Sequence, residues 1–418
     1  MFTSFSTALS ALNATSTAID VVGNNLANMN STGFKASEMS FSDLVTQSLG
    51  AGLGTTQVGF GTATPITLRN FAQGAIQTTG GVLDGAISGQ GFFVVQDPTS
   101  GNTEYTRAGS FQTDANGNLM TANGDYVQGW TADSTGAMDT NQAVSNIVIP
   151  VGSLQAPVAT TAVSAELNLN SAANADNTST FSMPITIYDS LGTSHVLTLS
   201  FTKTGDNAWA YTATLPAADL SDPTTAEVAT GNLVFQSDGT LDLTQTPTPV
   251  QFIVPAFVDG ATSGGTVTWS LTNSSGAGAI TQYDQPSASS SSSQDGQKAS
   301  QLVNVGLGNG GTLLAQYSDG QQVTVGQVAL ASICNPDSLI AVGNNNFMLS
   351  EASAAPNIGV PGTGGRGTIQ GGSIEASNVD IATEFTNLIV YQRGYEANGK
   401  VVSTANTLSQ DTINLIQG

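Results

Sequence analysis

The residue types best suited to chemistry are few in this chain and stand apart in the sequence. His195, in SHVLTLSF, is the only histidine, and Cys334, in the apolar run QVALASICNP, is the only cysteine. A catalytic triad or a nitrogen-ligated metal site would therefore depend on His195 alone, and a single cysteine excludes both an intrachain disulfide and a thiolate cluster. We interpret His195 as a surface side chain on a strand and Cys334 as a buried, unreactive thiol.

Two glycine patterns, GLGNGG (306–311) and GTGGRG (362–367), match the G-x-G-x-x-G of dinucleotide-binding loops. Such a loop must lie between a strand and a helix N-terminus, with an acidic residue about 20 positions further on. A predicted strand follows the first pattern and the second lies in a Pro/Gly loop, so we expect neither to bind a nucleotide. DANGN and SDGT resemble calcium-loop fragments but lack the bidentate glutamate, and nothing singles out a carboxylate pair for hydrolysis. We therefore predict no catalytic residue, no cofactor and no metal, and hence no enzyme.

The charge balance excludes whole classes of partner. The chain has 418 residues, with 8 Lys plus Arg against 30 Asp plus Glu, and a net charge of −22. Nucleic acid and anionic lipid would repel it, because phosphate binding needs clustered basic side chains. No apolar run approaches the ~20 residues of a membrane span, and MFTSFSTALSALNATSTAID lacks the features of a cleaved signal peptide. We expect no nucleic acid, no membrane insertion, and either an internal protein or export without a cleaved peptide.

Apolar residues recur every three or four positions at both ends of the chain, which is the spacing of an amphipathic helix. The N-terminal stripe consists of Phe2, Phe5, Leu9, Leu12, Ile19, Val22 and Leu26, and the C-terminal stripe of Phe385, Leu388, Tyr391, Tyr395, Val402, Leu408 and Leu415. We assign these residues to an assembly interface, in which the stripes pair with each other or with copies from neighbouring chains. Because isolated helices are marginal in water, we predict that both ends are largely disordered in the free monomer and fold on assembly. An ordinary intrachain helical hairpin fits the same periodicity equally well.

Each predicted helix has a polar boundary. In NNLANMNSTGFKAS (24–37) an Asn run is expected to end the first helix, since Asn tolerates left-handed backbone and satisfies free carbonyls, and Gly33 then permits a turn. Phe34 would anchor the departing chain, and Lys35 would offer a scarce positive charge to an acidic neighbour. In the run SNVD (377–380), Ser377 or Asn378 is predicted to cap the second helix, with the acidic Asp380 near its positive end.

Between the helices almost everything is predicted to be β-structure, with Asn-Gly and Asp-Gly turns. Residues 183–215 are predicted to form a three-stranded meander, and the Ser-rich stretch SASSSSSQDGQ (287–297) a linker. The expected fold is therefore mixed α and β and multidomain, with a terminal α-helical coiled-coil domain and two mainly antiparallel β domains of sandwich or barrel type. The expected parts are the helices (1–30 plus 375–418), a connecting segment (31–70 plus 361–374), a β domain (71–145 plus 286–360) and an inserted outer β domain (146–285).

Three blocks of this chain together resemble the axial proteins of the bacterial flagellum, that is, the rod, hook and hook-associated proteins. They are NNLANMNSTGFKAS, then SGQGFFVV with YTRAGSFQTDANGNLMTANGDYVQGW, and finally GGSIEASNVDIATEFTNLIVYQRGYEANGKVVSTANTL. They cover roughly the first 130 and last 50 residues. Rod proteins are generally much shorter, so the length and the inserted acidic β domain favour the hook proteins within this family.

The resemblance implies a structural subunit that polymerises into a curved, flexible tube and transmits torque from rod to filament. It implies inner helices that line a channel, outer β domains, and export by the flagellar type III apparatus. The implied partners are further copies of the chain, the distal rod protein, the hook cap, the hook–filament junction proteins and the export apparatus, at a hook attached to the basal body outside the cell. Since the family block contains Gly-Phe-Lys, we favour a contact between subunits for Phe34 and Lys35 over a plain helix end. A distal-rod or hook-associated protein, or a β-rich adhesin or enzyme, is the alternative.

Overall fold

The structure is a computed structural model that describes residues 2–44, 46–49, 56–133, 136–152, 154–175, 178–261, 265–273 and 275–417. The chain divides into two compact units, each described by itself. The first comprises Met1–Val151, Val303–Gln316 and Gln321–Gly418, and the second Gly152–Leu302 and Tyr317–Gly320.

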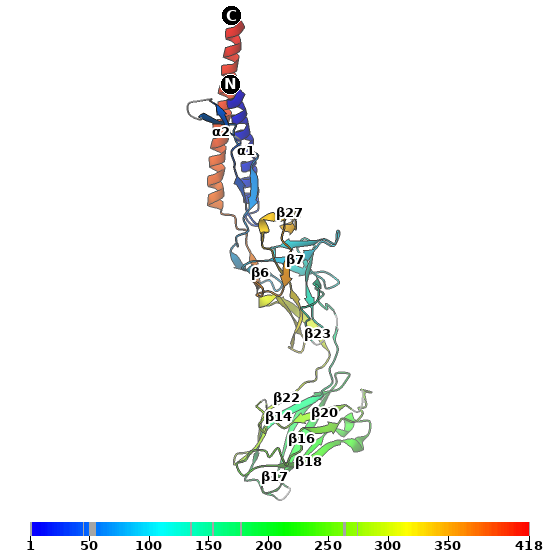
Figure 1. Cartoon of the computed structure of the whole chain (residues 1–418). Coiled ribbons are helices and arrows are strands. Elements are labelled where there is room, and N and C mark those ends of the chain that lie inside the picture. Colours follow the sequence, from blue (N-terminus) through cyan, green and yellow to red (C-terminus); the bar gives the residue numbers. More distant parts are fainter. Residues whose placement is uncertain are drawn as a thin grey trace. The chain divides into compact units, whose positions relative to one another are not determined.

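Two long helices belong to the first unit. Helix α1 (Phe2–Ala27) and helix α2 (Ile381–Gln417) lie side by side and run in opposite directions (Figure 1). The carboxylate of Asp380 caps α2 by accepting from the backbone amides of Ala382 and Thr383 at 2.9 and 3.1 Å. A capped start in this run is therefore confirmed, but the capping residue is Asp380 and not Ser377 or Asn378. Among the described residues, no helix is long and apolar enough to cross a membrane.

The Asn run ends α1 as the sequence predicts. After Ala27 the backbone amide of Asn28 donates to the carbonyl of Asn24, and the Asn28 side chain donates to the same oxygen at 2.9 Å. The chain then turns at Gly33, whose φ of 68° is a left-handed value that suits glycine.

The rest of the first unit is built from antiparallel strands. Two-stranded ladders join β1 (Ser37–Ser40) to β4 (Ile66–Arg69), β2 (Thr46–Leu49) to β3 (Thr56–Gly59), β5 (Ile76–Thr78) to β31 (Ser373–Glu375), and β6 (Gly85–Ser88) to β30 (Thr368–Gly371). The last two ladders are notable because each pairs an early segment with a late one, so both passes of the chain are tied together.

The largest sheet has the central order β24-β25-β11-β7-β8-β28-β27. These strands span Thr312–Tyr317, Gln322–Val328, Tyr126–Thr131, Phe92–Gln96, Thr103–Thr106, Asn346–Met348 and Ile340–Gly343. Shorter strands extend it: β9 (Phe111–Thr113), β10 (Leu119–Thr121), β12 (Ser145–Asn146), β26 (Leu330–Ser332) and β29 (Asn357–Gly359). Strand β23 (Ser300–Leu307) precedes β24 in the order, and β13 (Leu154–Gln155) precedes β23. One core cluster centres on Phe92 and Phe347, which meet each other and Phe71 edge to face.

The second unit is a β-sandwich. One sheet has the order β19 (Val250–Ile253), β20 (Thr266–Ser270), β14 (Ala162–Asn170), β21 (Ile280–Tyr283), with β22 (Ala288–Gln294) also on β14. The other is the meander β15 (Thr180–Tyr188), β16 (Ser194–Gly205), β17 (Ala208–Thr214), β18 (Glu227–Val234). Its first three strands form the three-stranded meander predicted for residues 183–215. Trp209 and Trp269 are fully buried in the core between the sheets. Burial of each such large side chain stabilises the unit by roughly 1.5–3 kcal/mol.

Three local predictions are wrong. His195 is buried, because the two-residue period of β16 places it on the same inward face as Leu197 and Leu199. Cys334 is exposed, since it follows strand β26 rather than lying within it. The Ser-rich stretch is not a linker: residues 288–294 form β22, which pairs antiparallel with β14. The predicted mixed α and β, multidomain architecture is confirmed.

Candidate assembly surface

Small residues make up part of the buried surface of the helix pair. The buried side chains of α1 include Ala8, Ala14, Ala18 and Val22, at most 4% exposed. On α2 the partly buried positions include Gly394, where an added Cβ would lie 3.7 Å from the Thr15 methyl carbon. The two helices therefore approach each other closely at Thr15 and Gly394.

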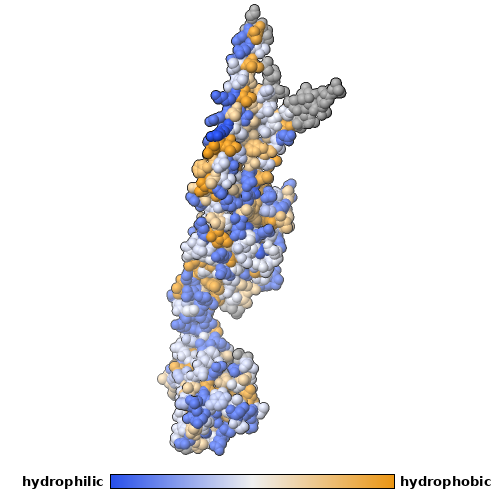
Figure 2. Space-filling model, turned by 90° about the vertical axis from the view of Figure 1, so that its left-hand side faces the viewer, coloured by the Kyte–Doolittle hydropathy of each residue, from blue (hydrophilic) through white to orange (hydrophobic). Residues whose placement is uncertain are grey.

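Several large apolar residues of both stripes are exposed at the surface of the subunit. Phe5 and Leu9 are 41% and 45% exposed on α1, and Phe385 and Leu408 are 52% and 54% exposed on α2. Figure 2 shows hydrophobic residues at the surface over the helical part of the molecule. Monomeric proteins rarely expose extensive apolar surface, and such surface marks protein–protein contacts.

The structure separates the predicted interface residues into three groups. Phe5, Leu9, Phe385, Tyr395, Leu408 and Leu415 are exposed; Leu12, Ile19, Leu26, Leu388, Tyr391 and Val402 are half-buried; Val22, Phe34 and Lys35 are buried. The side chain of Phe2 lies outside the described residues. The periodicity did not single out further exposed apolar residues: Ile389, Val390, Val401 and Ile413 on α2, and Ile66 and Leu68 on β4. A search for a second apolar face on α2 would have found the four residues on that helix.

At the base of the helices lies a buried charged cluster, formed by Lys35, Arg107 and Glu375. The Lys35 Nζ lies 2.6 Å from Glu375 Oε1, and the Arg107 Nη1 lies 3.0 Å from Glu375 Oε2. The three side chains are at most 5% exposed. Lys35 also donates to the carbonyl of Ala72. Burial is the main cause that lowers the pKa of Lys35, and the hydrogen bond and charge of Glu375 oppose that shift.

This cluster is where the three sequence blocks meet, because Lys35, Arg107 and Glu375 each come from a different block. Gly33 donates its amide to the Glu375 carbonyl at 2.8 Å. A Cβ at Gly33 would lie 2.5 Å from the Arg107 carbonyl carbon, so the close approach requires glycine. The blocks thus build an intrachain junction between the helices and the β region.

Phe34 and Lys35 therefore have partners within their own chain. Phe34 is only 7% exposed, and the acidic neighbour of Lys35 is Glu375 of the same subunit. The geometry places neither side chain on the surface of the subunit, where a direct contact with a neighbouring copy would require it. The predicted intersubunit role of these two residues has no support in their placement.

A second polar link joins the helices themselves. The Asn25 side chain donates to Glu384 Oε1 at 2.9 Å and to the Ser37 carbonyl at 2.8 Å. Burial raises the pKa of Glu384, as do the nearby charges of Glu38 and Asp380, whereas the Asn25 hydrogen bond acts in the opposite direction. Periodicity could not identify this pair, because Asn25 looks like part of the helix-ending run.

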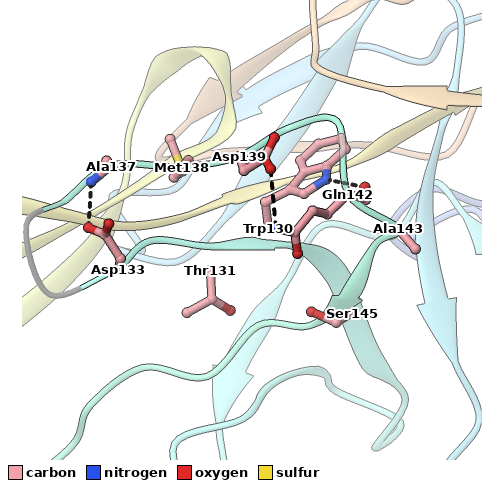
Figure 3. Close-up of a pocket in the computed structure, with 9 residues that line it drawn as sticks. All are labelled: Trp130, Thr131, Asp133, Ala137, Met138, Asp139, Gln142, Ala143 and Ser145. Carbon is pink, nitrogen blue, oxygen red and sulfur yellow. Dashed lines mark hydrogen bonds between the residues drawn. The ribbon is translucent and has the colours of Figure 1, made fainter.

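A hollow of about 500 Å³ in the first unit is lined by polar groups that bond to one another. In Figure 3 Trp130 Nε1 donates to the Gln142 carbonyl, the Gln142 side chain donates to Asp139, and the Ala137 amide donates to Asp133. Hydrogen bonds from the Asn141 amide and from Gln142 keep the pKa of Asp139 below its usual value. These are the contacts of a turn, and a lowered carboxyl pKa is opposite to what a general acid needs.

Comparison with known families matches four stretches of the chain. Residues 5–35 match the flagella basal body rod protein family, 86–165 the flagellar hook protein FlgE/F/G D1 domain, 154–297 the flagellar basal body protein FlaE D2 domain, and 370–415 the flagellar basal body rod FlgEFG protein C-terminal family. The matches to the rod and C-terminal families contain both helical stripes apart from Phe2.

Similar proteins match along the whole length. The flagellar hook protein FlgE of Salmonella typhimurium is 35% identical, covering 99% of this chain and 100% of that protein. The Escherichia coli protein of the same name is 33% identical over 98% and 99%, and that of Borreliella burgdorferi 32% over 99% and 100%. The crystal structure of Helicobacter pylori flagellar hook protein FlgE2 has a TM-score of 0.54 at 14% identity, covering 70% of this chain and 99% of that one, which shows a shared fold. With full-length identity above 30% to several relatives, the chain belongs to the flagellar hook protein FlgE family.

Proposed function

We propose that this chain is the structural subunit of a bacterial flagellar hook and works by polymerising with copies of itself. Full-length similarity to flagellar hook proteins supports the assignment. The structural observation that carries the polymerisation step is the exposure of the large apolar side chains of Phe5, Leu9, Phe385 and Leu408 on the two helices.

The polymer is an open tube. A head-to-tail contact between two different surfaces of identical subunits does not close on itself if its rotation and rise are those of a helix. The exposed apolar residues of α1 and α2 supply most of the association energy, since burial of each large apolar side chain is worth roughly 1.5–3 kcal/mol. All of the stripe residues assigned from the sequence, apart from the buried Phe34 and Lys35, remain candidates for this contact.

Bending requires weaker contacts away from the helices. Strand β22 offers one such surface, because six of its seven residues are exposed and five are serine. Short uncharged hydroxyl groups can exchange hydrogen-bond partners with water and with each other at little cost. Contacts of this kind between β units would slide as the tube compresses on its inner arc, and the tube can then pass torque from rod to filament while it bends.

The parts of the subunit, its partners and its location are proposed from the family and from the sequence. We propose that the helices, the connecting segment, the flanking β domain and the inserted β domain act as separate parts of the subunit. The partners are the distal rod protein, the hook cap, the junction proteins and the flagellar type III export apparatus, and the polymer lies outside the cell on the basal body. A single cysteine is compatible with passage of an unfolded chain through a narrow channel.

The test is immunogold electron microscopy of motile cells that carry an epitope in residues 222–226. These exposed or half-exposed residues include the short 3₁₀ helix Pro223–Thr225 and precede β18, so an insertion leaves the sheet intact. Label confined to a short curved segment between cell surface and filament is the expected result. Label along the filament, at its tip or over the cell surface would refute the assignment.

A further inference from the structure

The second unit contains a cluster of one histidine and three aspartates that the assembly function does not use. His195, on the inner face of β16, has Nε2 3.1 Å from Asp189 Oδ2 and Nδ1 3.0 Å from Asp219 Oδ2. Asp189 lies in the β15–β16 turn and Asp219 in the 3₁₀ helix η1 (Ala217–Asp219). Donor atoms of Asp189, His195 and Asp259 all lie within 4.8 Å of one another.

The imidazole is held in a fixed orientation. His195 is 4% exposed and its ring stacks on Phe257, with centroids 3.7 Å apart and planes inclined by 6°. Asp259 lies two residues after this phenylalanine and is exposed to solvent. The cluster therefore has a rigid buried side, formed by His195 and Asp189, and an open side at Asp259.

The arrangement leaves a position for a cation. A neutral imidazole carries one N–H, and Asp219 accepts it if the proton is on Nδ1. The Nε2 lone pair then faces the carboxylates of Asp189 and Asp259, and a cation or an extra proton must separate these groups. Among the described residues, neither a lysine nor an arginine forms an ion pair with these carboxylates.

We propose that His195 Nε2, with one carboxylate oxygen each from Asp189 and Asp259, forms a binding site for a divalent transition-metal ion of the Zn²⁺ type. One imidazole nitrogen and two carboxylate oxygens are an ordinary donor set for such an ion. Tetrahedral ligands at about 2.0–2.2 Å from one ion lie about 3.3–3.6 Å apart, so the separations within 4.8 Å require the exposed Asp259 carboxylate to move inward by about 1 Å. Water completes the coordination on the open side.

Two further contacts prepare the donors. Asp219 is a positioning residue, because a carboxylate that accepts Nδ1–H fixes the tautomer and directs Nε2 toward the ion. Asp189 is held by the backbone amides of Leu191 and Thr193, which donate to its Oδ1 at 2.8 and 2.9 Å and leave Oδ2 directed at His195.

The bound ion would tie the β15–β16 turn to the loop that follows Phe257, and would so stabilise the sandwich. The sequence pointed away from a metal site because His195 has no second histidine or cysteine near it. The two carboxylate ligands proposed beside His195 are Asp189 and Asp259, and the fold brings Asp259 to the other two residues. The inference concerns the second unit and does not depend on the polymerisation mechanism.

The experiment uses the purified full-length chain after removal of metals with EDTA. Zn²⁺ is titrated calorimetrically, stoichiometry is measured by mass spectrometry of metals, and Co²⁺ is used as a visible-absorption probe of coordination. We expect one Zn²⁺ per chain and a higher unfolding temperature for the second unit.

Asp259→Asn should weaken binding at least ~10-fold, and Asp219→Asn, which removes no ligand, by about 10–100-fold. Asp238→Asn is the matched control, because Asp238 lies in an exposed turn where it bonds to Thr240, and binding should be unchanged.

His195→Gln should abolish the Co²⁺ absorption, and circular dichroism will verify that the variant is folded. Since Asp259 is exposed, Asp259→Asn keeps the test decisive if His195→Gln does not fold. Absence of Zn²⁺ uptake, or uptake that is equal in Asp259→Asn and the control, would overturn the proposal. So would ¹⁵N spectra in which both His195 nitrogens stay protonated after Zn²⁺ is added, because a proton would then occupy the position of the ion.

Discussion

Lys35 and Glu375 are 340 positions apart in the sequence, yet the Lys35 Nζ lies 2.6 Å from Glu375 Oε1 in a site closed to solvent. The first of these residues follows α1 and the second precedes α2. Their contact, with Arg107 on the other oxygen of Glu375, joins the outgoing and returning passes of the chain. The contact therefore holds together the end of α1 and the start of α2 where both join the β region of their unit.

Glu375→Gln should destabilise the first unit by about 3–5 kcal/mol, because it leaves two buried cations without a counter-charge. Lys35→Met should cost less, since Arg107 and Glu375 can still pair. Urea unfolding followed by circular dichroism measures both. Glu351→Gln, at an exposed acidic residue, is the control and should stay within about 0.5 kcal/mol of the parent. Equal stability of Glu375→Gln and this control would contradict the assigned role of the cluster.

Two glycine substitutions near the end of α1 should have opposite effects on stability. Gly33→Ala places a Cβ against the Arg107 backbone at a left-handed residue, so it should destabilise by more than about 1 kcal/mol. Gly23→Ala lies inside α1 with nothing within 4 Å of the added Cβ, and should stabilise by roughly 0.5–1 kcal/mol. Thermal unfolding of the two variants side by side checks this, and a stabilising Gly33→Ala would be incompatible with the described turn.

The raised pKa of Glu384 predicts a pH dependence of the helix pair. The folded state favours the protonated carboxyl, so the associated stability is fully present below the ordinary pKa of 4.5 and is lost as pH rises through the folded-state value. Glu384→Gln mimics the neutral form and keeps an acceptor for Asn25. It should therefore be more stable than the parent at pH 7, with a smaller loss of stability between pH 4.5 and pH 7.

The measurement is urea unfolding of α1 and α2 by circular dichroism at several pH values. Glu396→Gln, at an exposed position on α2, serves as the control and should keep the pH profile of the parent. If Glu384→Gln were less stable than the parent at pH 7, the charged carboxylate would be the stabilising form and the prediction would fail.

Leu9→Asp should block polymerisation and leave the subunit folded, because Leu9 is 45% exposed on the outer side of α1. Ala18→Asp should instead break the subunit itself, since Ala18 is fully buried against the rest of the unit. Asn13→Asp adds the same charge at an exposed polar position and should still polymerise. Electron microscopy detects tubes and circular dichroism reports helix content; normal tubes from Leu9→Asp would remove the outer apolar face from the assembly surface.

The sequence predicts most of the architecture because its signals are local. The period of the apolar residues locates both helices, the SNVD run locates the start of α2, and turn chemistry locates the meander of the second unit. The full-length relatives confirm the family resemblance that the three blocks indicate. The structure adopts the helical hairpin within one chain, while disorder of the ends in the free monomer stays a prediction.

What could not be predicted depends on contacts across long separations. Periodicity gives the apolar stripe but not that Ala8, Ala14 and Ala18 are buried while Leu9 is exposed. Lys35 looks available for a partner subunit until the fold brings Glu375 to it. The inward position of His195 depended on the register of β16, since a shift of one residue reverses the face of every side chain.

The exposed large apolar residues of the two helices also have a consequence for the subunit before assembly. A folded free subunit has low solubility, because the exposed apolar residues of α1 and α2 can bind another copy without a conformational change. The net charge of −22 counteracts this tendency by mutual repulsion of copies in solution. Since salt screens that repulsion over about 10 Å at 0.1 M, ionic strength should control the critical concentration for spontaneous nucleation.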